Sequence, residues 1–532
     1  MSPRRTSRRR FLTRATRAGL GIGLGGGLLS GCPSEGEAVG PVATGGAGPE
    51  PWGAAPAGAL EGLLPAAARP EGVLELFLTG GVNPWDSFYV VPEFGDPAAG
   101  GPRAGSMWWT YQEPYGEEPT VPEMFAACGG GAQELLQPFA ADSAGRTVHL
   151  GPFVLALRER PDLLARMRVV VMRHSQAPHE TAIPLSLCGH RFGSPRMAST
   201  GTHVQRFHQE RSPRVPPHAY VLYPGLFDLD AFSADVGTAL GLHPGVARPL
   251  ELSLRFMDRL ATQLGRTQVP GDLARYDRAV DHYTAIQRRR LTTPGRDGTV
   301  RAPAFEDFEF ARRSMAGSPE LTDLFPEALL GTRPGEACGY DNDLDDTEHG
   351  LAVATRLLTH PTTPARWVTS IDGGLEGASG GLAYDTHNRH VAEGGRNLTH
   401  AMRRLVRRIN EPGEGDPDKL DLDRHLVVVS TEFGRTPYKE GEDGLDHWPG
   451  GYVQVLLGGP IGPDQAGVVG AIGEDGVATD WVTPAEFRAG MLQAQGIWPF
   501  SPEAFAVGEL RGGETGLDAA MALRERLWGR PT

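Results

Sequence analysis

Six short runs of β-branched and other apolar residues recur along the chain, with longer amphipathic stretches between several of them. The runs cover residues 73–80, 168–173, 219–223, 366–371, 425–431 and 452–459. Continuous apolar runs of this length are typical of strands buried on both faces, as in parallel sheets. Strands that alternate with helices indicate a doubly wound α/β fold, in which helices cover both faces of a mostly parallel sheet.

The helices of this fold are expected where apolar side chains recur every three or four residues. This pattern is found in residues 249–264, 272–290, 398–409, 484–496 and 517–528. The last two helices are expected to pack on the outside of the sheet. Residues 96–160 and 295–345 have weak patterns, and we interpret them as insertions or lids.

The first 32 residues have the order of an export signal. Ser7-Arg8-Arg9-Arg10-Phe11-Leu12 matches the twin-arginine pattern, a glycine-rich apolar stretch follows, and Leu29-Ser30-Gly31-Cys32 resembles a lipoprotein signal-peptidase box. A disordered basic leader would explain the arginines but not the succession of three elements. We therefore predict export by the twin-arginine route and a lipidated Cys32 that anchors the protein to a membrane, on the periplasmic face or the cell surface.

These boundaries divide the chain into four segments. Residues 1–31 are the predicted signal peptide, and residues 32–70, rich in Gly, Ala, Pro and Glu, are a predicted flexible tether. Residues 71–510 are the predicted folded domain, and residues 511–532 are a predicted helical tail.

Charge and cysteine content exclude some classes of protein. The net charge is −14, and the body of the chain has no basic stripe, which argues against nucleic acid as a partner. Only Cys128, Cys188 and Cys338 follow Cys32. This odd set allows at most one disulfide among them, so the hydrophobic core must carry the fold.

Carboxylates and imidazoles stand next to several predicted strands. They are Asp86, Asp385, His387, Glu432 and His447. Because ligands bind at the carboxyl ends of strands in an open parallel sheet, we expect these side chains to converge. Converging groups of this kind need a cation or hydrogen bonds to hold them, and mixed histidine and carboxylate ligation suits zinc or manganese. The pattern predicts one or two divalent ions.

Each of these residues alone also has a structural explanation. An aspartate after a strand is commonly a turn residue or helix N-cap, and Glu432 can form a buried ion pair with Arg435. The acidic segment 341–348 looks like a calcium loop but lacks the mid-loop glycine of an EF-hand. It precedes a predicted helix, where acidic side chains stabilise the helix dipole.

Several motifs resemble a bacterial sulfatase-like family, domain-of-unknown-function family 1501 of the alkaline-phosphatase-like superfamily. The motifs are LFLTGGVNPWDSF, GLAYDTHNRH, STEFGRTP, DHWPGGYVQVLLGG and GIWPFSPEAFAVG. The resemblance covers residues 70–510 and implies an alkaline-phosphatase-like fold. It also implies that the metal ligands are Asp86, Asp385, His387, Glu432 and His447. Phe433 stands where relatives have a second histidine, and His390 can replace His387 as a ligand.

The resemblance further implies a nucleophile at the start of a helix, with a histidine four positions later. Ser175 and His179 fit this spacing, and Thr181 is the fallback. Ser175 is equally well explained as a helix N-cap. Arg435 or Arg173 is expected to clamp an oxygen of the substrate.

Two functions follow from these expectations. The first is an exported metal-dependent hydrolase of phosphate or sulfate esters, whose substrate is a small anionic ester. The second is a surface lipoprotein that keeps the fold and the metal but binds a ligand or partner without catalysis. Phe433 favours the second, because it removes a ligand from one metal site.

Overall fold

The computed structural model describes residues 55–95, 109–112, 118–191, 194, 198–211, 220–225, 250–253, 273–292, 324–325, 329, 334–343, 345–375, 384–438, 445–500, 505 and 510–531. The predicted signal peptide, Cys32 and most of segment 295–345 lie outside these residues. All described residues belong to one compact unit of the chain.

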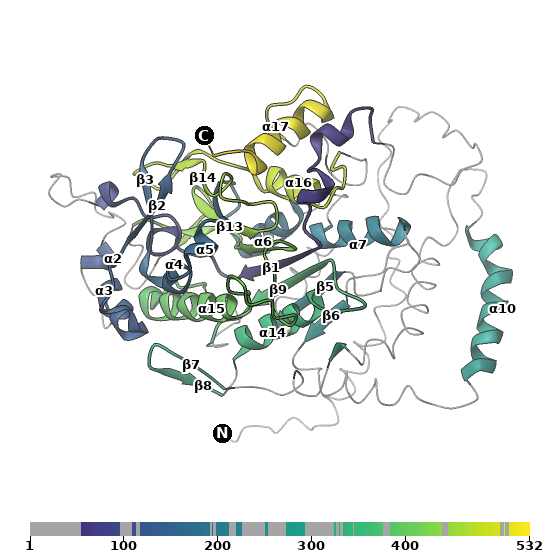
Figure 1. Cartoon of the computed structure of the whole chain (residues 1–532), viewed down its shortest axis with the longest axis horizontal. Helices are drawn as coiled ribbons and strands as arrows, with labels where there is room; N and C mark the ends of the chain where they lie inside the picture. Colours follow the sequence, from purple (N-terminus) through teal and green to yellow (C-terminus); the bar gives the residue numbers. More distant parts are fainter. Residues whose placement is uncertain are drawn as a thin grey trace, which may run out of the picture. The chain divides into compact units, whose positions relative to one another are not determined.

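A central sheet contains all six predicted strands (Figure 1). Its strands are β1 (Gly72–Leu78), β4 (Met167–Met172), β5 (Tyr220–Gly225), β6 (Leu250–Ser253), β9 (Trp367–Asp372), β10 (His425–Ser430), β13 (Tyr452–Gly458) and β14 (Gly467–Val469). Their order is β14-β4-β13-β10-β1-β9-β5-β6. The prediction of a mostly parallel α/β sheet is confirmed.

One strand runs against the others. β1 pairs in parallel with β9 and β10, whereas β13 is antiparallel to both of its neighbours, β10 and β4. The parallel direction predicted for residues 452–459 is therefore wrong. As a result, β13 begins at the sheet edge where β1, β9 and β10 end, and the residues before β13 lie among those that follow the other strands.

Helices cover both faces of the sheet, as predicted (Figure 1). On one face lie α14 (Asp346–Leu358) and α15 (Gly395–Arg407). On the other lie α6 (His179–Cys188), α7 (Thr200–Arg211), α16 (Pro484–Ala494) and α17 (Gly516–Trp528). In β1, Leu74 and Leu76 belong to the first core, and Val73 and Phe77 belong to the second. This alternation explains why β1 reads as a continuous apolar run.

Two predicted boundaries are wrong. Residues 250–253, predicted as the start of a helix, form β6, which pairs in parallel with the edge of β5; the remainder of that predicted helix lies outside the described residues. Part of the predicted tether is packed, because Leu63 is buried beside Trp498 and Ala520.

The helix predicted over residues 272–290 is α10 (Leu273–Thr292).

Short elements lie in the two predicted insertions. They include α3 (Val121–Phe125), α4 (Leu155–Arg158), the hairpin of β2 (Gln137–Ala141) and β3 (Thr147–Leu150), and the hairpin of β7 (Gly335–Ala337) and β8 (Tyr340–Asn342). A disulfide joins Cys128 to Cys338, and Cys188 is buried and not disulfide-bonded. This agrees with the expectation of at most one disulfide.

The acidic segment before α14 supplies the N-cap of this helix, Asp345. The Asp345 carboxylate accepts a hydrogen bond from the backbone N–H of Glu348 at 2.9 Å and pairs with His400 and Arg404. These partners support the helix interpretation rather than a calcium loop. None of the helices in the described ranges combines the length and apolar character needed to cross a bilayer.

Candidate metal centre

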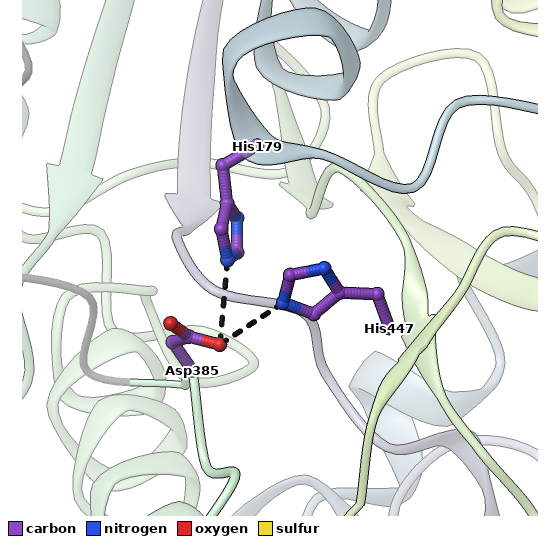
Figure 2. Close-up of side chains that lie close together, drawn as sticks. All are labelled: His179, Asp385 and His447. Carbon is purple, nitrogen blue, oxygen red and sulfur yellow. Dashed lines mark hydrogen bonds and ion pairs between the residues drawn. The ribbon is translucent and has the colours of Figure 1, made fainter.

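Three side chains from distant parts of the chain meet at the carboxyl edge of the sheet (Figure 2). His179 is in the first turn of α6, which follows β4, and Asp385 follows β9. His447 lies just ahead of β13. One donor atom from each of the three lies within 4.8 Å of the other two. The reversed direction of β13 is what brings His447 to this edge.

The Asp385 carboxylate lies at the centre of the cluster. Its Oδ1 is 3.3 Å from His179 Nε2 and 3.2 Å from His447 Nε2. His387 Nε2 also lies 3.2 Å from this oxygen. Donor atoms around a zinc ion with bonds of about 2.0–2.1 Å are separated by roughly 3.3 Å, so the spacing suits a small divalent cation.

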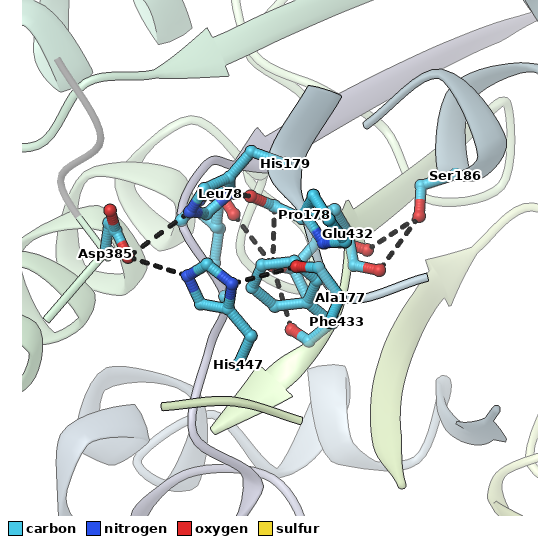
Figure 3. A network of polar contacts seen from close by, with 12 residues as sticks. Leu78, Ala177, Pro178, His179, Ser186, Asp385, Glu432, Phe433 and His447 are labelled. Carbon is cyan, nitrogen blue, oxygen red and sulfur yellow. Dashed lines mark hydrogen bonds and ion pairs between the residues drawn. The ribbon is translucent and has the colours of Figure 1, made fainter. Parts of the chain in front are cut away.

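The opposite ring nitrogens fix how His179 and His447 are oriented (Figure 3). His179 Nδ1 lies 2.9 Å from Glu432 Oε1, and His447 Nδ1 lies 2.8 Å from the Ala177 carbonyl oxygen. Both partners only accept hydrogen bonds, so each Nδ1 carries the proton and each Nε2 faces Asp385. Histidines that bind metals commonly donate their second N–H to a carboxylate or a carbonyl in this way.

The imidazole of His179 lies between the carboxylates of Asp385 and Glu432, an arrangement that a positive charge would stabilise. His179 Nε2 is buried and faces Asp385 Oδ1 at 3.3 Å. Burial lowers the pKa of His179, but the carboxylates of Asp385 and Glu432 outweigh it and raise the pKa to about 9. Burial raises the pKa of Asp385, but the imidazoles and Arg435 around Oδ1 hold the pKa far below its usual range. A proton supplies the charge in the metal-free protein, and a divalent cation fits the same position.

A second group of possible ligands overlaps the first at the surface. It consists of His387, Asp446 and His447. His387 Nε2 lies 3.0 Å from His447 Nε2, and the side chains of His387 and Asp446 are 46% and 43% exposed. Because both groups need Nε2 of His447 as a ligand, the two metal positions compete. The inner group is the better candidate, because a hydrogen bond at Nδ1 fixes the ring orientation of both of its histidines.

Glu432, predicted as a ligand, lies behind the cluster. Its Oε1 accepts hydrogen bonds from His179 Nδ1 and, at 2.7 Å, from the backbone N–H of Gly80. Its Oε2 lies 3.3 Å from Thr431 Oγ1. The carboxylate is fully buried. Glu432 therefore orients His179 and is not placed to bind the cation itself.

Arg435, predicted to clamp a substrate oxygen, is also committed inside the protein. It donates to Asp385 Oδ1 at 2.6 Å, to the Leu445 carbonyl at 3.0 Å, to the Gly81 carbonyl at 3.2 Å and to the Gly80 carbonyl. The guanidinium is fully buried. Arg435 therefore fixes Asp385 and the loop after β1, and its predicted contact with a substrate oxygen stays a prediction.

Phe433 closes the inner side of the cluster. Its ring stacks on His447 with the centroids 4.5 Å apart and lies 5.0 Å from His179. Gly81 has a φ of +98°, and a Cβ there would lie 2.7 Å from the Phe433 ring. Phe433 thus forms an apolar wall against both imidazoles.

Asp86 is not brought together with the other predicted ligands. Its Oδ2 lies 2.9 Å from His390 Nε2 and accepts a hydrogen bond from Asn83 Nδ2 at 2.8 Å. All three residues are buried. Asp86 is therefore absent from both groups of possible ligands among the described residues, and its predicted role as a metal ligand stays a prediction.

The predicted nucleophiles do not contact the cluster. Ser175 is exposed and precedes α6, whose N-cap is Pro178, so Ser175 is not a helix cap either. The Thr181 hydroxyl donates to the Pro178 carbonyl at 3.0 Å. Within the described ranges, no hydroxyl is hydrogen-bonded to the three clustered side chains. The spacing that singled out His179 was informative, but His179 is placed as a ligand.

His174 gives the loop before α6 a measurable pH dependence. Its Nε2 donates to the Glu432 carbonyl at 2.7 Å, and its Nδ1 accepts from the Gln176 N–H at 3.0 Å. Burial lowers the pKa of His174 to about 4.

His174 is protonated below pH 6.5 in the unfolded chain but only below about pH 4 in the folded protein. Between these pH values protonation therefore stabilises the unfolded chain. We therefore expect His174 to lower the free energy of unfolding by about 2 kcal/mol between pH 7 and pH 5. Urea unfolding at both pH values should show a smaller difference for His174→Gln than for the wild type. An equal difference in both proteins would contradict the assignment.

The comparisons with known proteins give a family but no activity. A family model described as "Protein of unknown function (DUF1501)" matches residues 73–501. No curated protein and no solved structure matches the chain. The matched region contains β1, β9, β10 and β13 and all three clustered residues. Because it spans well over half of the sequence, the chain belongs to the DUF1501 family of proteins of unknown function.

Proposed function

We propose that the protein is an exported, metal-dependent hydrolase of phosphate or sulfate esters with an alkaline-phosphatase-like, sulfatase-like fold. The observation that carries the proposal is the convergence of His179 Nε2, His447 Nε2 and Asp385 Oδ1, with each imidazole held from behind. Zinc or manganese suits this set of nitrogen and oxygen donors. Three protein ligands leave coordination positions for water and substrate, as in catalytic zinc sites.

The chemistry of the site follows from its parts. A bound divalent ion would lower the pKa of water and neutralise charge on a small anionic ester. Asp385 and the two histidines hold their donor atoms in fixed positions, and the Phe433 ring packs against both imidazoles on the inner side. His387 is half-exposed beside them, so its Nε2 is placed to give a proton to the leaving oxygen. Water is the proposed attacking group, because no described hydroxyl contacts the cluster.

A second candidate is a metal-containing surface lipoprotein that binds a ligand or partner without catalysis. Two observations favour it. Phe433 occupies the place of the second histidine, and Ser175 is not at the cluster. Such a protein would keep the metal for structure or for ligand binding.

Metal content and turnover separate the two functions. The full-length protein would be assayed with p-nitrophenyl phosphate, bis(p-nitrophenyl) phosphate and p-nitrophenyl sulfate, before and after chelation and after return of zinc or manganese. Turnover that depends on metal and is lost in Asp385→Asn supports the hydrolase. Bound metal with no cleavage of any ester at any pH supports the non-catalytic lipoprotein.

The leader gives the proposed location. We propose export by the twin-arginine route and anchoring through a lipid on Cys32, at the periplasmic face or the cell surface. The Cys128–Cys338 disulfide supports an oxidising compartment.

Replacing Cys32 by serine is expected to move most of the protein from the membrane fraction to the soluble fraction, because the lipid is the anchor. Replacing Arg8 and Arg9 by lysine should retain the precursor in the cytoplasm. Fractionation followed by immunoblotting measures both effects. A Cys32→Ser protein that stays in the membrane fraction would refute the lipid anchor.

A further inference from the structure

A chain of buried, hydrogen-bonded polar side chains begins at Thr386, the residue after Asp385 of the cluster. Asp86 Oδ2 lies 2.9 Å from His390 Nε2, and His390 Nδ1 lies 2.7 Å from Thr386 Oγ1. The three residues are 2%, 6% and 3% exposed. Asn83 Nδ2 lies 3.0 Å from the same His390 Nε2 and donates to Asp86 Oδ2 at 2.8 Å. Because the Asp86 carboxylate only accepts hydrogen bonds, we assign the proton to His390 Nε2, and Nδ1 then accepts from the Thr386 hydroxyl. The order of the chain is therefore Thr386 to His390 to Asp86.

Thr386 stands between two residues of the candidate metal centre. Along residues 384–387 the side chains alternate: Tyr384 and Thr386 are buried, whereas Asp385 and His387 reach the cluster with 23% and 46% of their side chains exposed. The Thr386 hydroxyl thus points into the protein, where it is bonded to His390. It anchors the short segment that presents Asp385.

The same segment has a second internal anchor. The Tyr384 hydroxyl donates to the buried carboxylate of Asp372 at 2.6 Å. Gly80 adds a steric limit, because a Cβ there would lie 2.1 Å from the Asp385 backbone nitrogen. The segment is therefore held on both sides of Asp385 in the chain, by Tyr384 before it and by Thr386 after it.

We propose that Asp86, His390 and Thr386 are positioning residues that set the geometry of the metal centre through the backbone of residues 385–387. The proposal rests on the metal-binding part of the proposed function and does not depend on ester hydrolysis. It gives Asp86 a different role from the one the resemblance implies, because its carboxylate acts through His390. Groups that orient metal ligands typically change metal affinity by about 10–100-fold when removed.

The test measures Co²⁺ binding by its visible absorption in the full-length protein. Thr386→Val keeps the shape of the side chain but removes the hydroxyl, and Asp86→Asn removes the charge at the far end. Both are expected to weaken Co²⁺ binding by about 10–100-fold and to alter the absorption band. Thr386→Ser restores the hydroxyl and is expected to restore affinity and spectrum.

Tyr89→Phe is the matched control for stability. The Tyr89 hydroxyl donates to the buried Asp142 carboxylate at 2.7 Å and accepts from the Ile472 N–H at 2.9 Å, and neither partner belongs to the cluster. Loss of this hydroxyl should lower the melting temperature at least as much as Thr386→Val does, because each change removes a buried, hydrogen-bonded hydroxyl, but it should leave Co²⁺ affinity unchanged. Wild-type affinity and spectrum in Thr386→Val would overturn the proposal, as would a wild-type protein that binds no Co²⁺. A wild type that binds Co²⁺ but cleaves no ester would remove the hydrolase function alone.

Discussion

Replacing His179 by alanine is expected to abolish metal binding and to lower kcat/KM for the ester by about 10³-fold or more. The expectation follows from the number of ligands. The inner group has three members, and the buried Nε2 of His179 faces Asp385 Oδ1 at 3.3 Å. Two remaining ligands would hold a divalent ion weakly, and the stabilisation of charge worth several kcal/mol would be lost.

Turnover of the best ester and metal content by mass spectrometry measure this effect together. His282→Ala is the matched control, because His282 is an exposed histidine of α10. It should change neither quantity. Full activity in His179→Ala would show that the reaction takes place elsewhere.

Replacing Arg435 by leucine is expected to lower the free energy of unfolding by about 3–5 kcal/mol. The buried guanidinium pairs with Asp385 and donates to the carbonyls of Gly80, Gly81 and Leu445. Its removal leaves a partly buried carboxylate and three carbonyls without their donor. Arg435→Lys should restore only part of the stability, because a single ammonium cannot reproduce the planar fork.

Urea unfolding of the chelated proteins measures this cost without a contribution from metal binding. Arg424→Leu is the control, because Arg424 forms an exposed ion pair with Glu71. That change should cost no more than about 1 kcal/mol. If Arg435→Leu costs no more than Arg424→Leu, the guanidinium does not hold the loop after β1.

Most of the sheet could be predicted from the sequence, because buried parallel strands are continuous apolar runs. All six predicted runs are strands. The direction of β13 could not be predicted, since the pattern VQVLL reads the same in a parallel or an antiparallel strand. β6 was missed because Leu250–Ser253 is only four residues long, too short to distinguish a strand from the first turn of a helix.

The candidate site could be predicted as a neighbourhood but not as a set of roles. Position after a strand placed Asp385 and Glu432 at one edge, and the structure brings them there. His447 precedes β13 and joins them because that strand is antiparallel to its neighbours. Position in the sequence did not show that Glu432 is hydrogen-bonded to Nδ1 of His179, or that Asp86 is bonded to His390. These roles depend on distances of a few ångströms between segments remote in sequence, which residue spacing does not encode.

The metal content of the full-length protein tests the central claim most directly. Wild type, His387→Ala, Asp385→Asn and His447→Ala would be reconstituted with zinc or manganese, dialysed and analysed by inductively coupled plasma mass spectrometry. We expect about one ion per chain in the wild type and in His387→Ala, and almost none in the other two variants. A wild type without metal, or equal metal in Asp385→Asn and His447→Ala, would contradict a metal centre at His179, Asp385 and His447.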